Sequence, residues 1–146
     1  MTERADGTHL WLVLMKAHRA LARHAERSIA ALDMCLSDFA ILELLLHKGP
    51  QKLTDLGRRI DLSSGAMTTA VDRLEARQLV ARSFDAADRR TRVVHLTPAG
   101  ESLIAAAFGE HAAAMNAAAG GLDADEQARL TALLKKLGTH AERQLT

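Results

Sequence analysis

Residues 83–100, SFDAADRRTRVVHLTPAG, form the segment that decides the fold of this chain. Two β-prone runs, residues 80–84 and 92–97, flank a short charged loop that carries the adjacent arginines Arg89 and Arg90. Two such runs joined by a short loop are typical of a β-hairpin. The sequence therefore predicts an exposed hairpin with a positively charged tip.

An amphipathic helix is predicted immediately before this hairpin, from residue 63 to about residue 77. It opens with Ser63, a favourable N-cap, and places Met67, Val71 and Leu74 on one face. A helix followed by a basic hairpin is the layout of a winged helix-turn-helix, in which the helix fits the major groove of DNA and the hairpin reaches the minor groove. Double-stranded DNA is therefore the expected partner.

Composition agrees with a DNA-binding surface in the middle of one domain. The 146 residues carry 19 basic and 18 acidic side chains, but residues 52–100 hold nine basic and six acidic ones. Solvated charged helix faces would give the same asymmetry. Aromatic residues are scarce, which disfavours a stacking platform for single-stranded nucleic acid.

The cellular location is predicted from the single cysteine and from the absence of long apolar segments. Cys35 cannot form an internal disulfide, which suits a reducing compartment. No apolar run approaches the roughly 20 residues of a membrane span, and the charges at Asp6, Lys16 and Arg19 interrupt any signal-peptide core. We expect a cytoplasmic protein without a membrane partner.

Long helices are predicted at both ends of the chain. Apolar residues recur at spacings of three and four over residues 8–32, and a second helix, capped by Ser37, runs to the Gly49-Pro50 break. A short helix follows at about residues 53–60. After the hairpin, Thr97 and Pro98 open an alanine-rich helix that ends at Gly120-Gly121, and a last helix spans about residues 123–145.

The predicted fold class is mainly α with a small β-hairpin wing: a winged helix-turn-helix between long N- and C-terminal dimerisation helices. Residues 1–146 form one subunit, with the winged helix-turn-helix at 37–97 and the dimerisation helices at 8–32 and 98–145. The terminal helices carry more apolar surface than so small a core covers, which predicts a homodimer. A monomeric helical bundle is the alternative.

Several motifs resemble the multiple-antibiotic-resistance-regulator (MarR) family of bacterial transcription regulators. The resemblance includes Leu36-Ser37 and the run Leu56…Ile60-x-Leu62-Ser63, and it continues through residues 67–75. Its most specific part is Asp85-x-x-Asp88-Arg89-Arg90, followed by Val94-x-Leu96-Thr97-x-x-Gly100. The resemblance implies a homodimer that binds a pseudo-palindromic operator and that loses DNA affinity on binding a small phenolic ligand or on thiol oxidation.

The predicted major-groove contacts lie on the helix that begins after Ser63. Its first N–H groups and the helix dipole attract phosphate, and small polar side chains leave them accessible. The side chains opposite the apolar face are free to contact bases or phosphates. The predicted set is Ser63, Ser64, Gly65, Thr68, Thr69 and Arg73. The alternative is a capped helix with a solvated polar face.

In the hairpin, the resemblance places the minor-groove arginine at Arg90. Asp88 is expected to accept hydrogen bonds from Arg90 and to orient its side chain, because a free arginine loses about 2 kcal/mol of rotamer entropy when it is fixed. Arg89 and Arg92 are expected phosphate contacts. The alternative for all four residues is a solvated tip with surface ion pairs worth under about 1 kcal/mol.

An apolar effector pocket is implied by the resemblance, near the junction of the first two helices. Its predicted lining is Trp11, Met15, His18, Met34, Phe39 and Phe108, although each of these also suits a core or a dimer interface. Cys35 lies in the same region and is a candidate redox sensor, while a small core residue is the more frequent role of a lone cysteine.

The seven histidines show no metal-ligand spacing, and no catalytic motif or cofactor-binding motif is present.

The functional hypothesis is a sequence-specific DNA-binding transcription regulator, a repressor released by a small apolar or phenolic effector. Two alternatives remain open at this point. One is a redox-sensing repressor that uses Cys35, and the other is a winged-helix module that binds proteins and has lost DNA binding.

Overall fold

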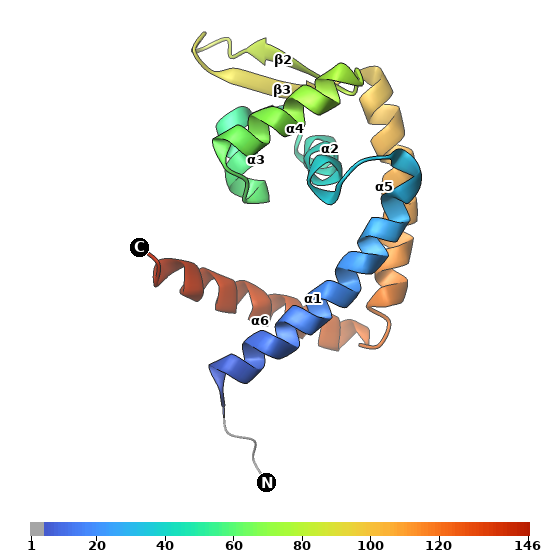
Figure 1. Cartoon of the computed structure of the whole chain (residues 1–146), viewed down its shortest axis with the longest axis vertical. Helices are drawn as coiled ribbons and strands as arrows, with labels where there is room; N and C mark the ends of the chain where they lie inside the picture. The colour runs from blue at the N-terminus through green and yellow to red at the C-terminus, as the bar shows by residue number, and fades with distance from the viewer. Residues whose placement is uncertain (1–4) are drawn as a thin grey trace.

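The computed structural model of the chain describes residues 5–146. Residues 1–4, which belong to the predicted subunit of residues 1–146, lie outside the described part. Figure 1 shows a head built from α2, α3, α4 and a small sheet, with the long helices α1 and α5 running together away from it. The predicted class, mainly α with a winged helix-turn-helix, is confirmed.

The secondary-structure elements follow the predicted order. The helices are α1 (Gly7–Ile29), the 3₁₀ turn η1 (Ala30–Leu32), α2 (Leu36–Lys48), α3 (Leu53–Ile60), α4 (Ser64–Ala76), α5 (Pro98–Ala118) and α6 (Ala124–Arg143). The strands are β1 (Gln51–Lys52), β2 (Val80–Phe84) and β3 (Arg92–Leu96). No helix within residues 5–146 is long and apolar enough to cross a membrane.

The core of the head forms where the apolar faces of α2 and α4 meet the sheet and the start of α5. Met67, Val71 and Leu74 of α4 are fully buried, as the spacing predicts. They join Phe39 and Leu42 of α2. From the other elements, Leu56, Val80, Val94 and Ile104 complete the cluster. This cluster fixes α4 against the head and leaves its opposite face outward.

The sheet has the order β1-β3-β2, and both pairings are antiparallel. Within the hairpin, Val80 lies opposite Leu96 and Phe84 opposite Arg92. The strand β1 was not predicted, because two residues are too short to show an alternating pattern. It pairs Gln51 with Val94 and so anchors the hairpin to the start of α3.

One predicted helix start was wrong. The N-cap of α2 is Cys35, not Ser37, and its side chain forms no capping hydrogen bond. The helix begins at Leu36 because this side chain packs against the core, and the Phe39 N–H donates to the carbonyl of Cys35 at 3.1 Å. The caps at Ser63, Thr97 and Asp123 are present.

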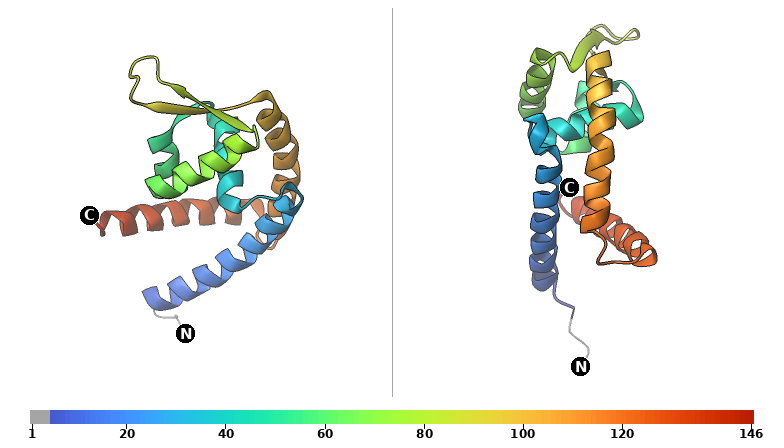
Figure 2. Two further views of the ribbon diagram at one scale, coloured as in Figure 1. Left: turned by 45° about the horizontal axis from the view of Figure 1, so that its top comes forward. Right: turned by 90° about the vertical axis from the view of Figure 1, so that its right-hand side faces the viewer.

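Most of the exposed large hydrophobic side chains among residues 5–146 lie on the terminal helices α1 and α6. In Figure 2, α6 leaves the far end of α5 and turns back toward the head. It has no buried residue, and its leucines Leu130, Leu133 and Leu134 are 39–54% exposed. Trp11 of α1 is 58% exposed. Apolar faces of this extent mark an interaction surface.

Candidate nucleic-acid interface

Helix α4 presents a polar N-terminal half to solvent. The Ser63 hydroxyl accepts a hydrogen bond from the Ala66 N–H at 3.2 Å and so caps the helix. The first N–H groups of a helix lack intrahelical acceptors, and the helix dipole adds positive potential there. The exposed set of this half is Ser63, Ser64, Gly65, Thr68 and Thr69. These residues form one surface at the start of the helix.

Thr69 has one internal hydrogen bond. Its hydroxyl donates to the carbonyl of Gly65 at 3.0 Å, one turn earlier. The donor capacity of this hydroxyl is therefore used within the helix, while its lone pairs and methyl group remain outward. A contact of Thr69 with DNA would thus be that of an acceptor or an apolar group.

Arg73 has a partner within the chain, although its side chain is 51% exposed. Its Nε and Nη2 atoms donate to the two carboxylate oxygens of Asp38 at 3.1 and 2.8 Å. Asp38 is only 4% exposed. The hydrogen bonds and the charge of Asp38 raise the pKa of Arg73 above its ordinary value. The sequence prediction of Arg73 as a DNA contact did not foresee this partner, which lies 35 residues away and has no local signal.

Arg82 is a second arginine that acts inside the head, and sequence reasoning missed it. From β2 it forms an ion pair with Asp72, and its Nε lies 3.9 Å from a carboxylate oxygen of Glu75. Both acids belong to α4. Their spacing of three residues places them on one side of the helix, and this was the available signal. Arg82 thus neutralises the acids of α4 beside the hairpin.

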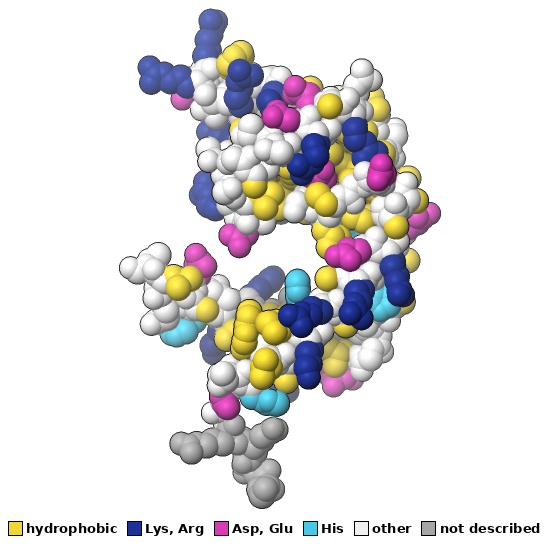
Figure 3. Space-filling view, in the orientation of Figure 1, with side chains coloured by type: hydrophobic (Ala, Val, Ile, Leu, Met, Phe, Trp, Pro, Cys, Tyr) yellow, Lys and Arg dark blue, Asp and Glu magenta, His cyan; other side chains and the backbone are white. Residues whose placement is uncertain are grey.

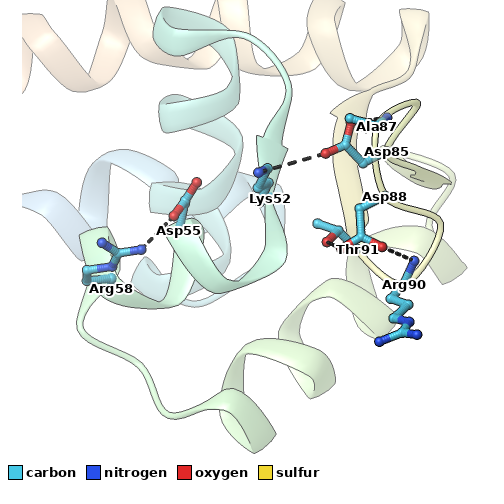
Figure 4. Close-up of polar contacts among 8 residues, drawn as sticks. All are labelled: Lys52, Asp55, Arg58, Asp85, Ala87, Asp88, Arg90 and Thr91. Carbon is cyan, nitrogen blue, oxygen red and sulfur yellow. Dashed lines mark hydrogen bonds and ion pairs between the residues drawn. The ribbon is translucent and has the colours of Figure 1, made fainter.

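The loop of the hairpin is held by its own aspartates (Figure 4). We call β2, β3 and this loop the wing. Asp85 accepts a hydrogen bond from the Ala87 N–H at 3.2 Å and lies 3.8 Å from the ammonium of Lys52. Asp88 accepts from the backbone N–H of Arg90 at 3.0 Å and from the hydroxyl of Thr91 at 3.3 Å. The loop is therefore ordered by side chain to backbone bonds.

These contacts correct the predicted role of Asp88. It was expected to orient the Arg90 side chain, but its bond goes to the Arg90 backbone, and Figure 4 shows the guanidinium pointing away from it. The reason is local. An aspartate two residues before an N–H forms an Asx turn, which satisfies the carboxylate without the guanidinium. Asp88 shapes the loop and leaves the Arg90 side chain free.

The arginines of the wing have different surroundings. Within residues 5–146, neither Arg89 nor Arg90 forms a side-chain hydrogen bond or ion pair, and both are exposed. Arg92 lies with its guanidinium carbon 4.3 Å from the ring centroid of Phe84, its cross-strand neighbour. Such an exposed cation–π contact is worth about 0.5–1 kcal/mol. Arg89 and Arg90 are the two unengaged cations at the tip.

A hollow of about 440 Å³ separates the wing from the start of α3. Arg90, Thr91 and Arg92 line it from the wing. Lys52, Leu53, Thr54 and Asp55 line the other side. In Figure 1 the wing tip and the N-terminal end of α4 lie on the same side of the head, and Figure 3 shows one group of Lys and Arg side chains at this corner and another over the long helices. The start of α4 and the wing tip therefore lie on one side of the head, and the hollow lies between the wing and α3.

The root of the wing is tied to α5 through Thr97 and Gly100. The Thr97 hydroxyl accepts from the Gly100 N–H at 3.0 Å and donates to the Gln78 carbonyl at 2.6 Å, while the Thr97 N–H donates to the Leu79 carbonyl at 3.1 Å. A Cβ on Gly100 would lie 1.9 Å from that Leu79 oxygen. Only glycine allows this approach, which explains the Leu-Thr-x-x-Gly pattern after the wing.

The six predicted effector-pocket residues do not share one environment in the subunit. Phe39 is in the core with its ring 4.8 Å from that of His111, and Phe108 packs edge-on against His47 at 4.6 Å. Met34 packs against the core, while Met15 is half-buried. Trp11 and His18 are exposed on α1. The subunit alone therefore does not assemble this lining into one cavity.

Cys35 is exposed at the start of α2, in the connection that follows α1. Its thiol is close enough to Arg73 to contribute to the raised pKa of that arginine. No three His, Cys, Asp or Glu side chains among residues 5–146 are grouped to hold a metal ion.

Comparison with known proteins gives a family model, a sequence relative over nearly the whole chain and similar solved structures. The MarR family model matches residues 35–91. The HTH-type transcriptional regulator MhqR of Bacillus subtilis (strain 168) is 35% identical over 142 residues, which cover 97% of each chain. Among solved structures, Bordetella bronchiseptica BpsR, whose DNA binding is regulated by 6-hydroxynicotinic acid, is 27% identical, with a TM-score of 0.79 over 91% of this chain and 93% of its own.

A third likeness concerns the fold alone. A cysteine-to-serine mutant of MarR from E. coli, solved with operator DNA, superposes with a TM-score of 0.80 at 24% identity, over 88% of this chain and 92% of that one. The helices, the sheet and the wing therefore have the arrangement of a winged helix that has been seen on DNA.

Proposed function

The chain belongs to the MarR family of transcription regulators, and from this premise we propose that it is a repressor that binds a pseudo-palindromic operator as a homodimer. One observation carries the proposal. The polar half of α4 and the two unengaged arginines of the wing tip lie on one side of the head, at a spacing that the fold fixes. One element suits the major groove and the other the minor groove.

The proposed contacts follow from the hydrogen-bonding groups and charges that have no partner within residues 5–146. The first turn of α4 would hold a phosphate through its N–H groups, and Thr68 and Thr69 would face base edges or thymine methyl groups. Arg90 would enter the minor groove, where an unpaired guanidinium senses the potential of a narrow A·T segment. Arg89 and Arg92 would contact phosphates. Arg73 is left out of this set, because Asp38 holds it.

The proposed dimer uses the exposed faces of the terminal helices. Leu133 and Leu137 of α6 are 54% and 37% exposed, and Leu10 of α1 lines a hollow of about 490 Å³ with them. A second copy would cover these leucines with its own, since a two-fold axis brings identical faces together. Residues 8–32 and 98–145 would then be the dimerisation helices, and residues 37–97 the DNA-binding region.

We further propose a small aromatic effector, apolar or phenolic. The relative BpsR is regulated by an aromatic acid of this size. In this chain, a hollow of about 420 Å³ between α2 and α3 has Leu44 and Ile60 in its lining. The basic lining residues His47, Lys48 and Arg59, which outnumber the one carboxylate, Glu43, would face an anionic group. Its size is that of a small-molecule site. Salicylate and 6-hydroxynicotinic acid are suitable probes.

The test of the DNA contacts is selection from a random double-stranded library, followed by titration of variants. We expect a pseudo-palindrome whose half-sites lie about one helical turn apart. Arg90→Ala should lower affinity for the selected site by about tenfold or more, while the dimer stays intact by sedimentation. A library that shows no enrichment, with an intact dimer, would contradict the proposal and support a protein-binding module.

The effector is tested on the same DNA complex. Either probe at millimolar concentration should release the operator, and Arg59→Ala should raise the concentration needed. Operator affinity that stays constant across a panel of phenols would contradict this part. The alternative sensor is the exposed thiol of Cys35. Cys35→Ser should then abolish release by peroxide or quinone, and unchanged release in that variant would remove the thiol as the switch.

A further inference from the structure

Two arginines near the end of α4 point back to the segment that joins α1 to α2. Arg73 binds the Asp38 carboxylate through two hydrogen bonds, at 3.1 and 2.8 Å. Arg77, one turn later, donates from Nη1 to the Asp33 carbonyl at 3.2 Å and from Nη2 to the Leu32 carbonyl at 2.9 Å. We call residues 32–38 the connection. Both ends of the connection are therefore bonded to the helix that is expected to read DNA.

The connection is the covalent route from the long helix α1 to the head. It begins at η1, passes through Asp33, whose left-handed φ of 53° ends the 3₁₀ turn, and ends in the first turn of α2. A movement of α1 relative to the head must bend these few residues, while the packing of α1 along α5 is a second, noncovalent route. Residues three and four apart share a helix face, so Arg73 and Arg77 lie one above the other and together span the connection.

The Arg73 pair joins a guanidinium whose side chain is 51% exposed to a buried carboxylate. Asp38 is 4% exposed, and the guanidinium meets both carboxylate oxygens, the arrangement that gives arginine its directional selectivity. Arg77 adds bonds to backbone carbonyls, which do not swing away as a side-chain acceptor would. The apolar core holds the buried face of α4, and these two arginines add directional bonds between the C-terminal end of α4 and the connection.

We infer that Arg73 and Arg77 are positioning residues, which fix the rotation and tilt of α4 relative to α1 and thereby make operator recognition depend on the connection. The inference rests on the proposed function of DNA reading and goes beyond it. Affinity for any DNA depends on phosphate contacts, which tolerate small shifts of the helix. Discrimination between sequences depends on base-edge contacts, which do not. Loss of the positioning bonds should therefore lower specificity more than it lowers nonspecific binding.

The test is a double-mutant cycle with Asp38→Asn and Arg73→Gln, measured on operator and on scrambled DNA over a series of salt concentrations. Each single variant should lose about tenfold or more in operator affinity, with scrambled-DNA affinity within about twofold. The double variant should lose no more than either single one. The slope of log affinity against log salt should remain that of the wild type, whereas Arg89→Gln, a proposed phosphate contact, should reduce it by about one.

Two outcomes would overturn the inference. If Arg73 contacts DNA, Asp38→Asn will free it, so that operator affinity will hold or rise while Arg73→Gln lowers the salt slope. If the pair serves only the fold, both variants will lower the urea midpoint of unfolding with the operator-to-scrambled ratio unchanged. If Asp38→Asn does not fold, Arg77→Gln is the variant that decides, because it leaves no buried charge unpaired. The readout is again the ratio of operator affinity to scrambled-DNA affinity.

Hydrogen exchange tests the positioning role of Arg77 independently of whether the protein reads DNA. In Arg77→Gln, the amides of residues 30–38 and 73–79 should exchange faster than in the wild type, while those of the Arg89→Gln control should not change. If the wild type shows no operator preference but exchange rises, DNA reading fails and the positioning role stands. Unchanged exchange in Arg77→Gln would overturn the positioning role whatever the protein does on DNA.

Discussion

Gly100→Ala is the most severe single substitution that this fold suggests. A Cβ at residue 100 would lie 1.9 Å from the Leu79 carbonyl oxygen and 2.8 Å from its carbon. Ordinary contact begins near 3.4 Å, so the start of α5 must move away from the root of the wing by about 1.5 Å. The obstacle is backbone, which cannot rotate aside as a side chain can.

The cost combines overpacking with weakened hydrogen bonds. Forcing one extra carbon into a packed site costs about 1–3 kcal/mol. The same displacement strains the bonds of Thr97 to Gln78 and Leu79, each worth about 1 kcal/mol. We expect a loss of about 3 kcal/mol in unfolding free energy, or about 10 °C in Tm. Operator affinity should fall as well, because Leu79 leads directly into β2.

Urea denaturation followed by circular dichroism measures this loss, at one fixed subunit concentration because a dimer unfolds in a concentration-dependent way. Gly109→Ala is the matched control. Residue 109 lies on the same helix, and a Cβ added there would meet open space, with nothing within 4 Å. Alanine should therefore stabilise that helix by about 0.5–1 kcal/mol. If Gly100→Ala proves as stable as Gly109→Ala, the account of the wing root is refuted.

Three further predictions concern a cap, the dimer face and a titrating group. Thr97→Ala should cost about 1–2 kcal/mol in urea denaturation, because it removes the cap of α5 and the bond to Gln78, whereas Thr97→Ser should remain close to the wild type. Leu133→Asp should yield monomers in sedimentation and weaken operator binding, and a dimer that persists would contradict the proposed interface. Hydrogen bonds from Thr8 lower the pKa of Asp6 below its ordinary 3.8, so its cap stabilises α1 above that pH and is lost as pH falls through the lowered pKa. Asp6→Asn should flatten the helical circular dichroism signal across this acidic range, and an unchanged profile would contradict the cap.

The periodicity of the sequence predicts most of the fold because it reports burial directly. Met67, Val71 and Leu74 recur at helical spacing and are fully buried, and Gly49, with a φ of 75°, ends α2 at the expected break. The strand β1 is not predicted from the sequence, because a two-residue strand has no periodicity. Its partner, β3, lies more than forty residues away.

The site is harder to predict than the fold, because its side chains choose distant or backbone partners. The sequence predicts Arg73 as a DNA contact, but the fold brings Asp38, 35 residues earlier, beside it. Asp88 looks like a support for a side chain, and it binds a backbone N–H instead. The residues predicted to line the effector pocket do not meet in the subunit, and the reason is different. Trp11, for example, lies on an apolar face that a second chain is proposed to cover.

The most direct test of the central claim is a titration of the wild-type protein on DNA from upstream of its own gene, against a scrambled duplex of equal length, at about 150 mM salt. Gel shift or fluorescence anisotropy serves as the readout. Because specific binding exceeds nonspecific binding by at least about a thousandfold in such regulators, we predict a ratio of that size with one dimer per site. Equal affinity for the two duplexes would contradict the conclusion that α4 and the wing read a DNA sequence.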